Sequence, residues 1–499
     1  MLVSARDLEG GAVLTADVCI AGAGAAGITL ALELRDSGLD VIVLVGGGIE
    51  ATDAEQALYR GVMSGIDTWA PEMHRVRALG GSTQSWSGWC RPLEVEDFEA
   101  REHIPQSGWP ITRAQLEPYY ARAHRTLALG AVNYDTPAVA ARAGVPPLPF
   151  EEGDARTEMF QFSTPIRMQE AYRAPLEEAD DIRVYQHAHL VDVVAGGTEV
   201  LRFECRTLQG GTSFQVEAGR YVMALGGIEN ARMLLASDGG RGVANGSGAV
   251  GRYFMEHPHY YRSAAIVVPD ALDVGFYERF EADTRVADDD EEQRVRVVGV
   301  LALSREARER EGLPAFLAQL APADAATEQE RGRTGRLGPL GVAELFSPGA
   351  TPGLLNLTCR VEQTPDPDSR ITLRSERDAL GLPVLDLHWA IRPEDDRALL
   401  RGLELLGTEV ARAGLGRLWI PTSGEAFEGT PKGGCHHMGT TRMGEDPERA
   451  VVDADCRSFD LDNLYIAGSS VFPTGGASNP TLTITALAHR LADHLKEAT

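Results

Sequence analysis

The stretch from residue 17 to residue 45 reads DVCIAGAGAAGITLALELRDSGLDVIVLV. Its first residues form a short apolar run, which is typical of a buried parallel strand. A glycine-rich turn follows, then a helical stretch from Ile28 to Leu34 that Gly38 ends, and then a second apolar run from Val41 to Leu44. This order predicts a strand–helix–strand unit and, with it, a parallel sheet.

The glycines of this turn follow the pattern Gly22-x-Gly24-x-x-Gly27. In such a pattern the first glycine makes a tight turn, the second lets the backbone approach a pyrophosphate, and the third brings the helix close to the strand. The helix N-terminus adds free N–H groups for the phosphate. Between a strand and a helix, the pattern indicates a dinucleotide-binding fold.

The end of the second strand departs from this pattern. An acidic residue is expected there to hold the adenosine ribose, but the sequence has Val45 followed by three glycines. Glu50 could replace it only if the loop folds back, and no arginine stands at the strand end to bind a 2′-phosphate. Either the site depends on its phosphate contacts or it holds its cofactor weakly, and the sequence leaves both open.

Three later segments could join this site. Residues 77–89 form a small-residue loop with two tryptophans, whose glycines would let the backbone lie close to a flat ring, although a tight turn with core tryptophans is the alternative. Residues 219–230 predict a strand that returns to the nucleotide sheet. Residues 190–194 predict a strand in which Val191 could lie beside an adenine or serve only the core.

The C-terminal region places His436 and His437 in a glycine-rich segment. Residues 463–468 predict one more strand. Asn479 then fits a helix cap and Pro480 a first helical position, ahead of a terminal helix that starts near Thr481.

In this combination the chain resembles the glucose–methanol–choline (GMC) oxidoreductase family, nearest to bacterial pyranose oxidases and C-glycoside 3-oxidases. The segments that carry the resemblance occur in the family's order along nearly the whole chain. They are the glycine pattern of residues 22–27, Gly80-Gly81-Ser82, residues 224–230, His436-x-x-Gly439-Thr440, residues 463–465 and residues 478–481.

The resemblance implies a catalytic pair above flavin N5. His436 would accept the proton of the substrate hydroxyl as a hydride passes to the flavin, and Asn479 would orient that hydroxyl. The alternative is a buried histidine beside an asparagine that only caps a helix. His437 is expected to point away as a structural neighbour. His257 and His259 match a segment beneath the flavin, where they would support the site rather than bind a metal.

The resemblance also implies FAD as the cofactor. Pyranose oxidases often attach FAD through a histidine just before the tryptophan of the Gly-Gly loop, but this chain has Ser85 there, so we expect non-covalent binding. The start of the terminal helix would stabilise the anion of the reduced flavin. The expected cofactor contacts are Gly22, Gly24, Gly27, Gly80, Gly81, Ser82, Ser85, Val191, Gly226, Gly468, Pro480 and Thr481.

Composition narrows the function classes. The 499-residue chain has a net charge of −26, which disfavours nucleic acid and anionic membranes as partners. No apolar run reaches the ~18 residues of a membrane span, and the N-terminus lacks a signal-peptide pattern. Six cysteines without CxxC spacing predict reduced thiols, a cytoplasmic protein and no metal site.

We therefore expect an α/β protein with a Rossmann-like FAD-binding domain of the GMC type, interleaved with an α+β substrate domain built on an antiparallel sheet. The charge-dense residues 303–338 predict a solvated helical insertion that could serve as a mobile lid or as an oligomer contact. The expected domains are 1–110, 180–260 and 425–499 for FAD, and 111–179 and 261–424 for the substrate.

The expected function is oxidation of a secondary alcohol, a sugar or glycoside hydroxyl, to a keto-sugar. Dioxygen or another electron acceptor would re-oxidise the flavin. One alternative is the same chemistry on a non-sugar alcohol of a biosynthetic pathway. The other is a flavin-poor protein that binds ligands or catalyses a lyase reaction, which Val45 and the altered Gly-Gly loop would mark.

Overall fold

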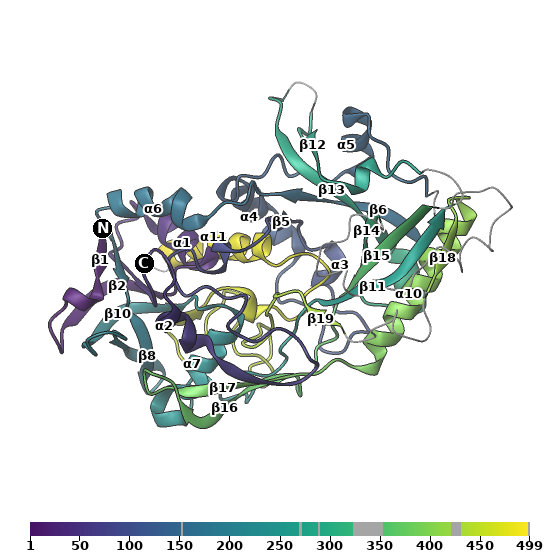
Figure 1. Ribbon diagram of the computed structural model, residues 1–499. Coiled ribbons are helices and arrows are strands. Elements are labelled where there is room, and N and C mark those ends of the chain that lie inside the picture. Colours follow the sequence, from purple (N-terminus) through teal and green to yellow (C-terminus); the bar gives the residue numbers. More distant parts are fainter. Residues whose placement is uncertain (151–152, 269–271, 288–289, 323–352, 421–430, 498–499) are drawn as a thin grey trace.

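The computed structural model describes residues 1–499 except 151–152, 269–271, 288–289, 323–352, 421–430 and 498–499 (Figure 1). The described residues have a mixed α/β fold with three sheets. Their helices are α1 (Ala25–Leu34), α2 (Asp53–Gln56), α3 (Val95–Phe98), α4 (Arg113–Thr126), α5 (Thr136–Ala143), α6 (Met168–Glu178), α7 (Gly226–Gly240), α8 (Arg305–Glu311), α10 (Pro393–Arg412) and α11 (Thr481–Glu497).

The first sheet has eight strands and contains the unit that the opening stretch predicts. Strands β2 and β3 are parallel and α1 connects them. Strand β10 pairs in parallel with β2 on one side and β20 on the other, so two later segments return to this sheet. The strands are β1 (Leu2–Ser4), β7 (Ile182–Gln186), β3 (Val41–Val45), β2 (Val13–Ala21), β10 (Ser213–Met223), β9 (Glu199–Arg206) and β8 (His189–Gly196) in order, with β20 (Leu464–Ile466) beside β10.

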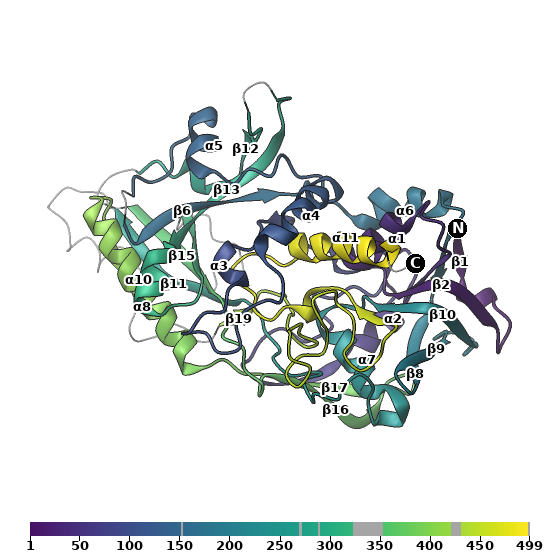
Figure 2. The same cartoon turned by 180° about the vertical axis from the view of Figure 1, so that it is seen from behind.

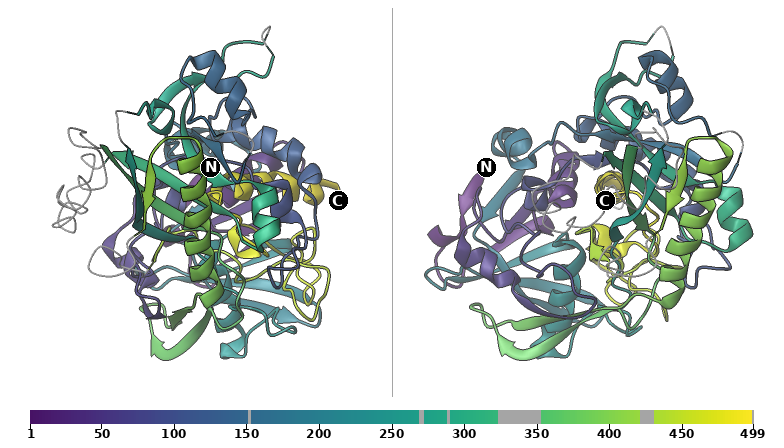
Figure 3. Two further views of the ribbon diagram at one scale, coloured as in Figure 1. Left: turned by 90° about the vertical axis from the view of Figure 1, so that its right-hand side faces the viewer. Right: turned by 45° about the vertical axis from the view of Figure 1, so that its right-hand side comes forward.

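The second sheet has nine strands, and its pairings are antiparallel. One face packs against the amphipathic helix α10, whose Leu399, Leu403 and Leu406 are buried there (Figure 3, left). The strands are β18 (Arg417–Trp419), β11 (Pro258–Val268), β15 (Gly353–Val361), β14 (Phe316–Pro322), β13 (Arg294–Leu303), β6 (Ala155–Phe162) and β5 (Trp89–Cys90) in order, with β12 (Phe280–Asp283) beside β13 and β19 (Lys432–Gly433) beside β11.

A third sheet has three strands: β16 (Arg370–Arg377), β17 (Pro383–Trp389) and β4 (Gly61–Gly65). Part of the charged segment 303–338 belongs to the second sheet rather than to a separate solvated insertion. Leu303 ends β13, α8 carries the buried Arg308 in an ion pair with Glu96, and β14 follows. Residues 323–338 lie outside the described residues.

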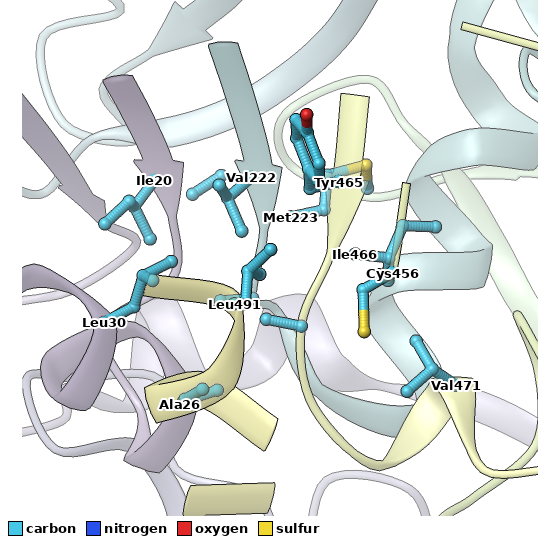
Figure 4. Packing of buried hydrophobic residues seen from close by; sticks show 14 of the residues in the cluster. Ile20, Ala26, Leu30, Val222, Met223, Cys456, Tyr465, Ile466, Val471 and Leu491 are labelled. Carbon is cyan, nitrogen blue, oxygen red and sulfur yellow. The ribbon is translucent and has the colours of Figure 1, made fainter. Parts of the chain in front are cut away.

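Helix α11 packs against α1 and α4, and its buried side chains share one core with the first sheet (Figure 2). Its buried Leu491 lies in the core near Val222 of β10, and Leu30 of α1 lies near Ile20 of β2 (Figure 4). Each fully buried leucine stabilises such packing by about 1.5–3 kcal/mol. The N-terminus of α11 is thereby fixed relative to the sheet. Among the described residues, no helix is both long and apolar enough to cross a membrane.

We expect Gly27→Ala to destabilise the fold. A Cβ atom at position 27 would lie 1.9 Å from the carbonyl oxygen of Gly22, so α1 would have to move off the strand. The free energy of unfolding should fall by about 1–3 kcal/mol, measured by chemical denaturation. Gly10→Ala is the control, because a Cβ there meets nothing within 4 Å. Equal stability of the two variants would contradict the close contact.

Candidate active site

A cavity of about 440 Å³ opens at the carboxyl ends of the parallel strands. The residues that follow β2, β3, β10 and β20 line it: Gly22, Gly46, Ala224 and Ala467. In open α/β sheets this edge is where ligands bind. Residues 74–78, 81–83, 85–89, 434–437 and 479–481 also line it.

Most of the residues expected in the site line this cavity. They are Gly22, Gly24, Gly81, Ser82, Ser85, Gly226, His436, Gly468, Asn479, Pro480 and Thr481. Gly27 does not, because it faces the Gly22 carbonyl. Gly80 lies behind the wall, where its N–H donates to the Ala23 carbonyl at 2.7 Å and joins the two glycine loops. Val191 packs against the core, and its neighbour His189 lines the cavity instead.

Three glycines give the cavity a bare backbone surface. A Cβ atom added to Gly24, Gly226 or Gly468 would meet no atom within 4 Å, although all three line the wall. A side chain there would project into the cavity. Gly226 and Gly468 also have φ values of +90° and +114°, which favour glycine.

Two helix N-termini meet the cavity without a capping side chain. The N-cap residues are Gly24 for α1 and Leu225 for α7, and neither provides a side-chain hydrogen bond. The first N–H groups of such helices favour an anion, and phosphate most of all. At these two helix starts the cavity wall therefore presents backbone N–H groups, which carry no net charge but have partial positive charges that attract an anion.

Basic side chains stand where the glycine pattern calls for an acidic one. Val45 is buried, and the exposed Glu50 does not line the cavity. A Cβ at Gly46 would lie 3.0 Å from Arg77 Nε, which donates to His189 Nδ1 at 3.4 Å. Sequence analysis missed both residues, because Arg77 comes from a different segment and only the fold brings it to the strand end.

Glu229 on α7 forms ion pairs with two arginines of this wall, Arg75 and Arg77, and with Arg232 of its own helix. Its carboxylate lies 3.0 Å from Arg75, 3.3 Å from Arg232 and 3.7 Å from Arg77. Burial alone would raise the pKa of Glu229, but the three guanidinium groups bring that pKa down to about 2. The carboxylate is thus ionised at neutral pH and orders the wall beside the cavity.

The two residues expected to form a catalytic pair meet on the cavity wall. Asn479 Nδ2 lies 2.9 Å from His436 Nε2. On its other side, Asn479 Oδ1 accepts a hydrogen bond of 2.8 Å from Arg360 Nη1 of β15. Helix α11 begins at Thr481, so the Asn479 side chain binds these two partners rather than capping the helix.

His257, from the residues just before β11, holds the other nitrogen of His436. The two Nδ1 atoms are 2.8 Å apart. Burial first, and then the nearby His257, His259, Arg360 and His437, lower the pKa of His436 well below 6.5. The imidazole is therefore neutral at pH 7.

A buried carboxyl group supports the loop that carries His436. Glu256 Oε2 accepts hydrogen bonds from the backbone N–H groups of His436 at 2.8 Å and His257 at 3.3 Å. Burial raises the pKa of Glu256 to about 8, although these N–H groups lower it. His437 also lines the cavity, but its ring turns to Glu256 Oε1 at 3.3 Å and stacks on Phe254.

The cysteines are not part of a covalent framework. All six are free, and Cys435, with a φ of +62°, lies directly before His436. Among the described residues, no group of three or more His, Cys, Asp or Glu side chains is placed to hold a metal ion.

Both the C-terminal part and the whole chain are similar to known proteins. Residues 365–488, which include His436 and Asn479, match the GMC oxidoreductase family model for the C-terminal domain. The whole chain is similar to a paromamine 6′-oxidase of Streptomyces fradiae, with 27% identity over 95% of this chain and 90% of the relative.

Two further proteins are similar to this chain. A C-glycoside 3-oxidase of Arthrobacter globiformis is 35% identical over 24% of this chain and 22% of its own length. The solved structure of pyridoxine 4-oxidase from Mesorbium loti superimposes with a TM-score of 0.56 and 18% identity, covering 96% of this chain and 98% of that one. The latter likeness shows that the two chains share a fold.

Proposed function

We propose that this protein oxidises a hydroxyl group of a sugar or glycoside, with FAD bound non-covalently in the cavity. The observation that carries the proposal is the 2.9 Å contact between His436 and Asn479 on the wall of a dinucleotide-type cavity. The names of the relatives support the substrate class, since they denote oxidases of a glycoside and of paromamine.

The residues of the cavity suit FAD. The bare backbone at Gly24, with the uncapped N-terminus of α1, would hold its pyrophosphate. Arg77 and His189 would face the adenosine ribose in place of the missing acidic residue. Ser85 offers no covalent attachment, and the helix start at Pro480 and Thr481 would lie near the ring.

Bound FAD would supply the acceptor for the hydride that leaves the carbinol carbon, and dioxygen or another acceptor would take up the electrons. The chain's own residues manage the proton. Neutral His436 would accept the hydroxyl proton while the carbon–oxygen bond becomes a carbonyl, and the amide of Asn479 would hold the oxygen. With a secondary hydroxyl the product is a keto-sugar.

We also propose that the FAD and substrate domains interleave with the boundaries expected above, in a cytoplasmic protein. In support, strands of the first sheet come from residues 2–45, 182–223 and 464–466, and most strands of the second come from residues 155–162 and 258–433. The substrate would then approach His436 from the side of the second sheet, where Arg360 and Phe160 lie.

A panel of alcohols tests the proposed function. Purified protein saturated with FAD is mixed without oxygen with sugars, glycosides and lipophilic alcohols, and the loss of flavin absorbance is recorded. We expect a sugar or glycoside to bleach the flavin and to yield a ketone. Bleaching by lipophilic alcohols alone would favour the non-sugar alternative. Protein that takes up no FAD would favour the flavin-poor alternative.

Gly24→Ala tests the cofactor site separately from the fold. The new methyl group meets no protein atom, so the free energy of unfolding without FAD should stay as in the wild type. It would occupy the space of the pyrophosphate, so FAD affinity should fall at least about tenfold, measured by quenching of flavin fluorescence. Unchanged affinity would place the cofactor elsewhere.

His436→Ala should slow anaerobic flavin reduction by about 10²–10⁴-fold with nearly normal FAD affinity.

In the wild type the pKa of His436 is lowered well below 6.5, so the base is unprotonated above that pH. The rate of flavin reduction should fall only well below pH 6.5, because the imidazolium form of His436 cannot accept a proton. An acidic limb with an apparent pKa at or above about 6.5 would contradict this assignment.

A further inference from the structure

We propose that His257 and Arg360 fix the tautomer of His436, so that its Nε2 atom carries no hydrogen and can accept the proton of the substrate hydroxyl. The proposal deepens the proposed function, since it takes His436 as the base. Four hydrogen bonds link Arg360, Asn479, His436, His257 and the carbonyl of Gly476 in one continuous chain. The direction of each bond follows from the two ends.

From one end, the guanidinium sets the direction. Burial lowers the pKa of Arg360 only to about 10, so at pH 7 the group is charged and can only donate. Asn479 must therefore turn its oxygen to Arg360 and its NH₂ group to His436. Because that NH₂ group also only donates, His436 Nε2 must accept and carries no hydrogen.

From the other end, two carbonyl groups set the direction. His257 Nε2 lies 2.9 Å from the oxygen of Gly476 and 3.3 Å from that of Gly475, and both oxygens can only accept. Burial lowers the pKa of His257 to about 3, so the ring is neutral and its single hydrogen is on Nε2. His257 Nδ1 must then accept from His436, which places the hydrogen of His436 on Nδ1.

The hydrogen bonds at the Arg360 end and those at the His257 end each place the hydrogen of His436 on Nδ1. With the opposite tautomer, His436 Nδ1 and His257 Nδ1 would face each other with two lone pairs at 2.8 Å. At the same time the Nε2 hydrogen of His436 would point at the NH₂ group of Asn479. Both contacts would be repulsive in a buried site, where unpaired polar groups are costly.

Both ends of the chain are themselves held in place. The N–H of Gly476 donates to Glu362 Oε1 at 3.1 Å, and Glu362 accepts two hydrogen bonds of 2.7 Å from Arg101. Arg360 lies over the ring of Phe160. Within the described part of the chain no carboxylate lies within ion-pair distance of Arg360, in contrast to Arg101, so the amide of Asn479 is its polar side-chain partner there.

This arrangement prepares the site for a hydroxyl group. A substrate hydroxyl would replace the Asn479 NH₂ group as the donor to His436 Nε2. The NH₂ group would then move off the imidazole and donate to the hydroxyl oxygen. When His436 takes the proton, its Nδ1–H remains bonded to His257, which shares the positive charge. His257 and Arg360 are thus positioning residues that act through His436 and Asn479.

Nitrogen NMR reads the tautomer without depending on activity. The FAD-loaded protein is labelled with ¹⁵N-histidine, and the His436 signals are those lost in His436→Gln. At pH 7 we expect a neutral ring with the hydrogen on Nδ1. His257→Phe and Arg360→Met should each move these signals toward the other tautomer. The control His124→Phe removes another buried histidine that is bonded to Gly130 and Tyr134 and should leave them unchanged.

Kinetics separate positioning from a merely structural role. His257→Phe should lower the rate of flavin reduction about 10–100-fold, as removal of outer hydrogen-bond partners does at metal sites, with FAD affinity unchanged. His257→Asp supplies an acceptor-only group, so it should restore the tautomer and much of the rate. Its carboxylate should also shift the acidic limb of the pH profile upward, because it favours the imidazolium.

A wild-type His436 with its hydrogen on Nε2, or protonated at pH 7, would overturn the proposal. So would His257→Phe and Arg360→Met variants with unchanged signals and rates. The outcome is distinguishable from failure of the proposed function: if no alcohol reduces the flavin but His436 carries its hydrogen on Nδ1, the function is wrong and the tautomer assignment stands.

Discussion

The hydrogen bond between Asn479 and His436 is the contact on which the rest of the site depends. It joins two segments that the fold holds by different means. The loop of His436 is tied down by the buried Glu256 beneath it. Asn479 precedes α11, whose burial against the first sheet fixes the helix as a rigid body. The 2.9 Å contact exists only because both supports place their residues at the same edge of the parallel sheet.

That edge also explains why the cavity suits a dinucleotide. Parallel strands end together, so the turns after β2, β10 and β20 bring three unhindered glycines to one wall. The same arrangement gathers helix N-termini on the electropositive side. The proposed base His436 therefore lies next to the proposed cofactor site. Strand β15 of the second sheet adds Arg360, and His257 comes from the residue directly before β11.

The sequence predicted the parts of this site that depend on local patterns. The glycines of residues 22–27 define their own turn, and residues 219–230 were predicted to return to the nucleotide sheet, as β10 does. Residues 463–468 were predicted only as a strand, and the structure adds that this strand, β20, pairs with β10. His436 and Asn479 followed from family resemblance rather than from spacing. Residues 303–322 were expected to be solvated because residues 305–311 are charge-dense. Ala307 and Arg308 of α8 are nevertheless buried, and the uncharged residues 316–322 form β14.

Residues that act through distant contacts could not be found in this way. Arg77 reaches the end of β3 from another loop, Glu229 forms ion pairs with Arg75 and Arg77 of that loop, and Arg360 meets Asn479 across 119 positions. The sequence around each of these residues does not reveal its role, because that role depends on a charged or polar partner that only the fold brings near. Val191 shows the converse, since a strand was located correctly but its residues that line the cavity are His189 and Leu190.

A crystal structure of the protein with FAD tests the central claim most directly. The account predicts that the pyrophosphate lies at Gly24 and the start of α1, and that the flavin ring lies beside the paired side chains of His436 and Asn479. A flavin ring on another wall, or a pair that separates when FAD binds, would contradict it.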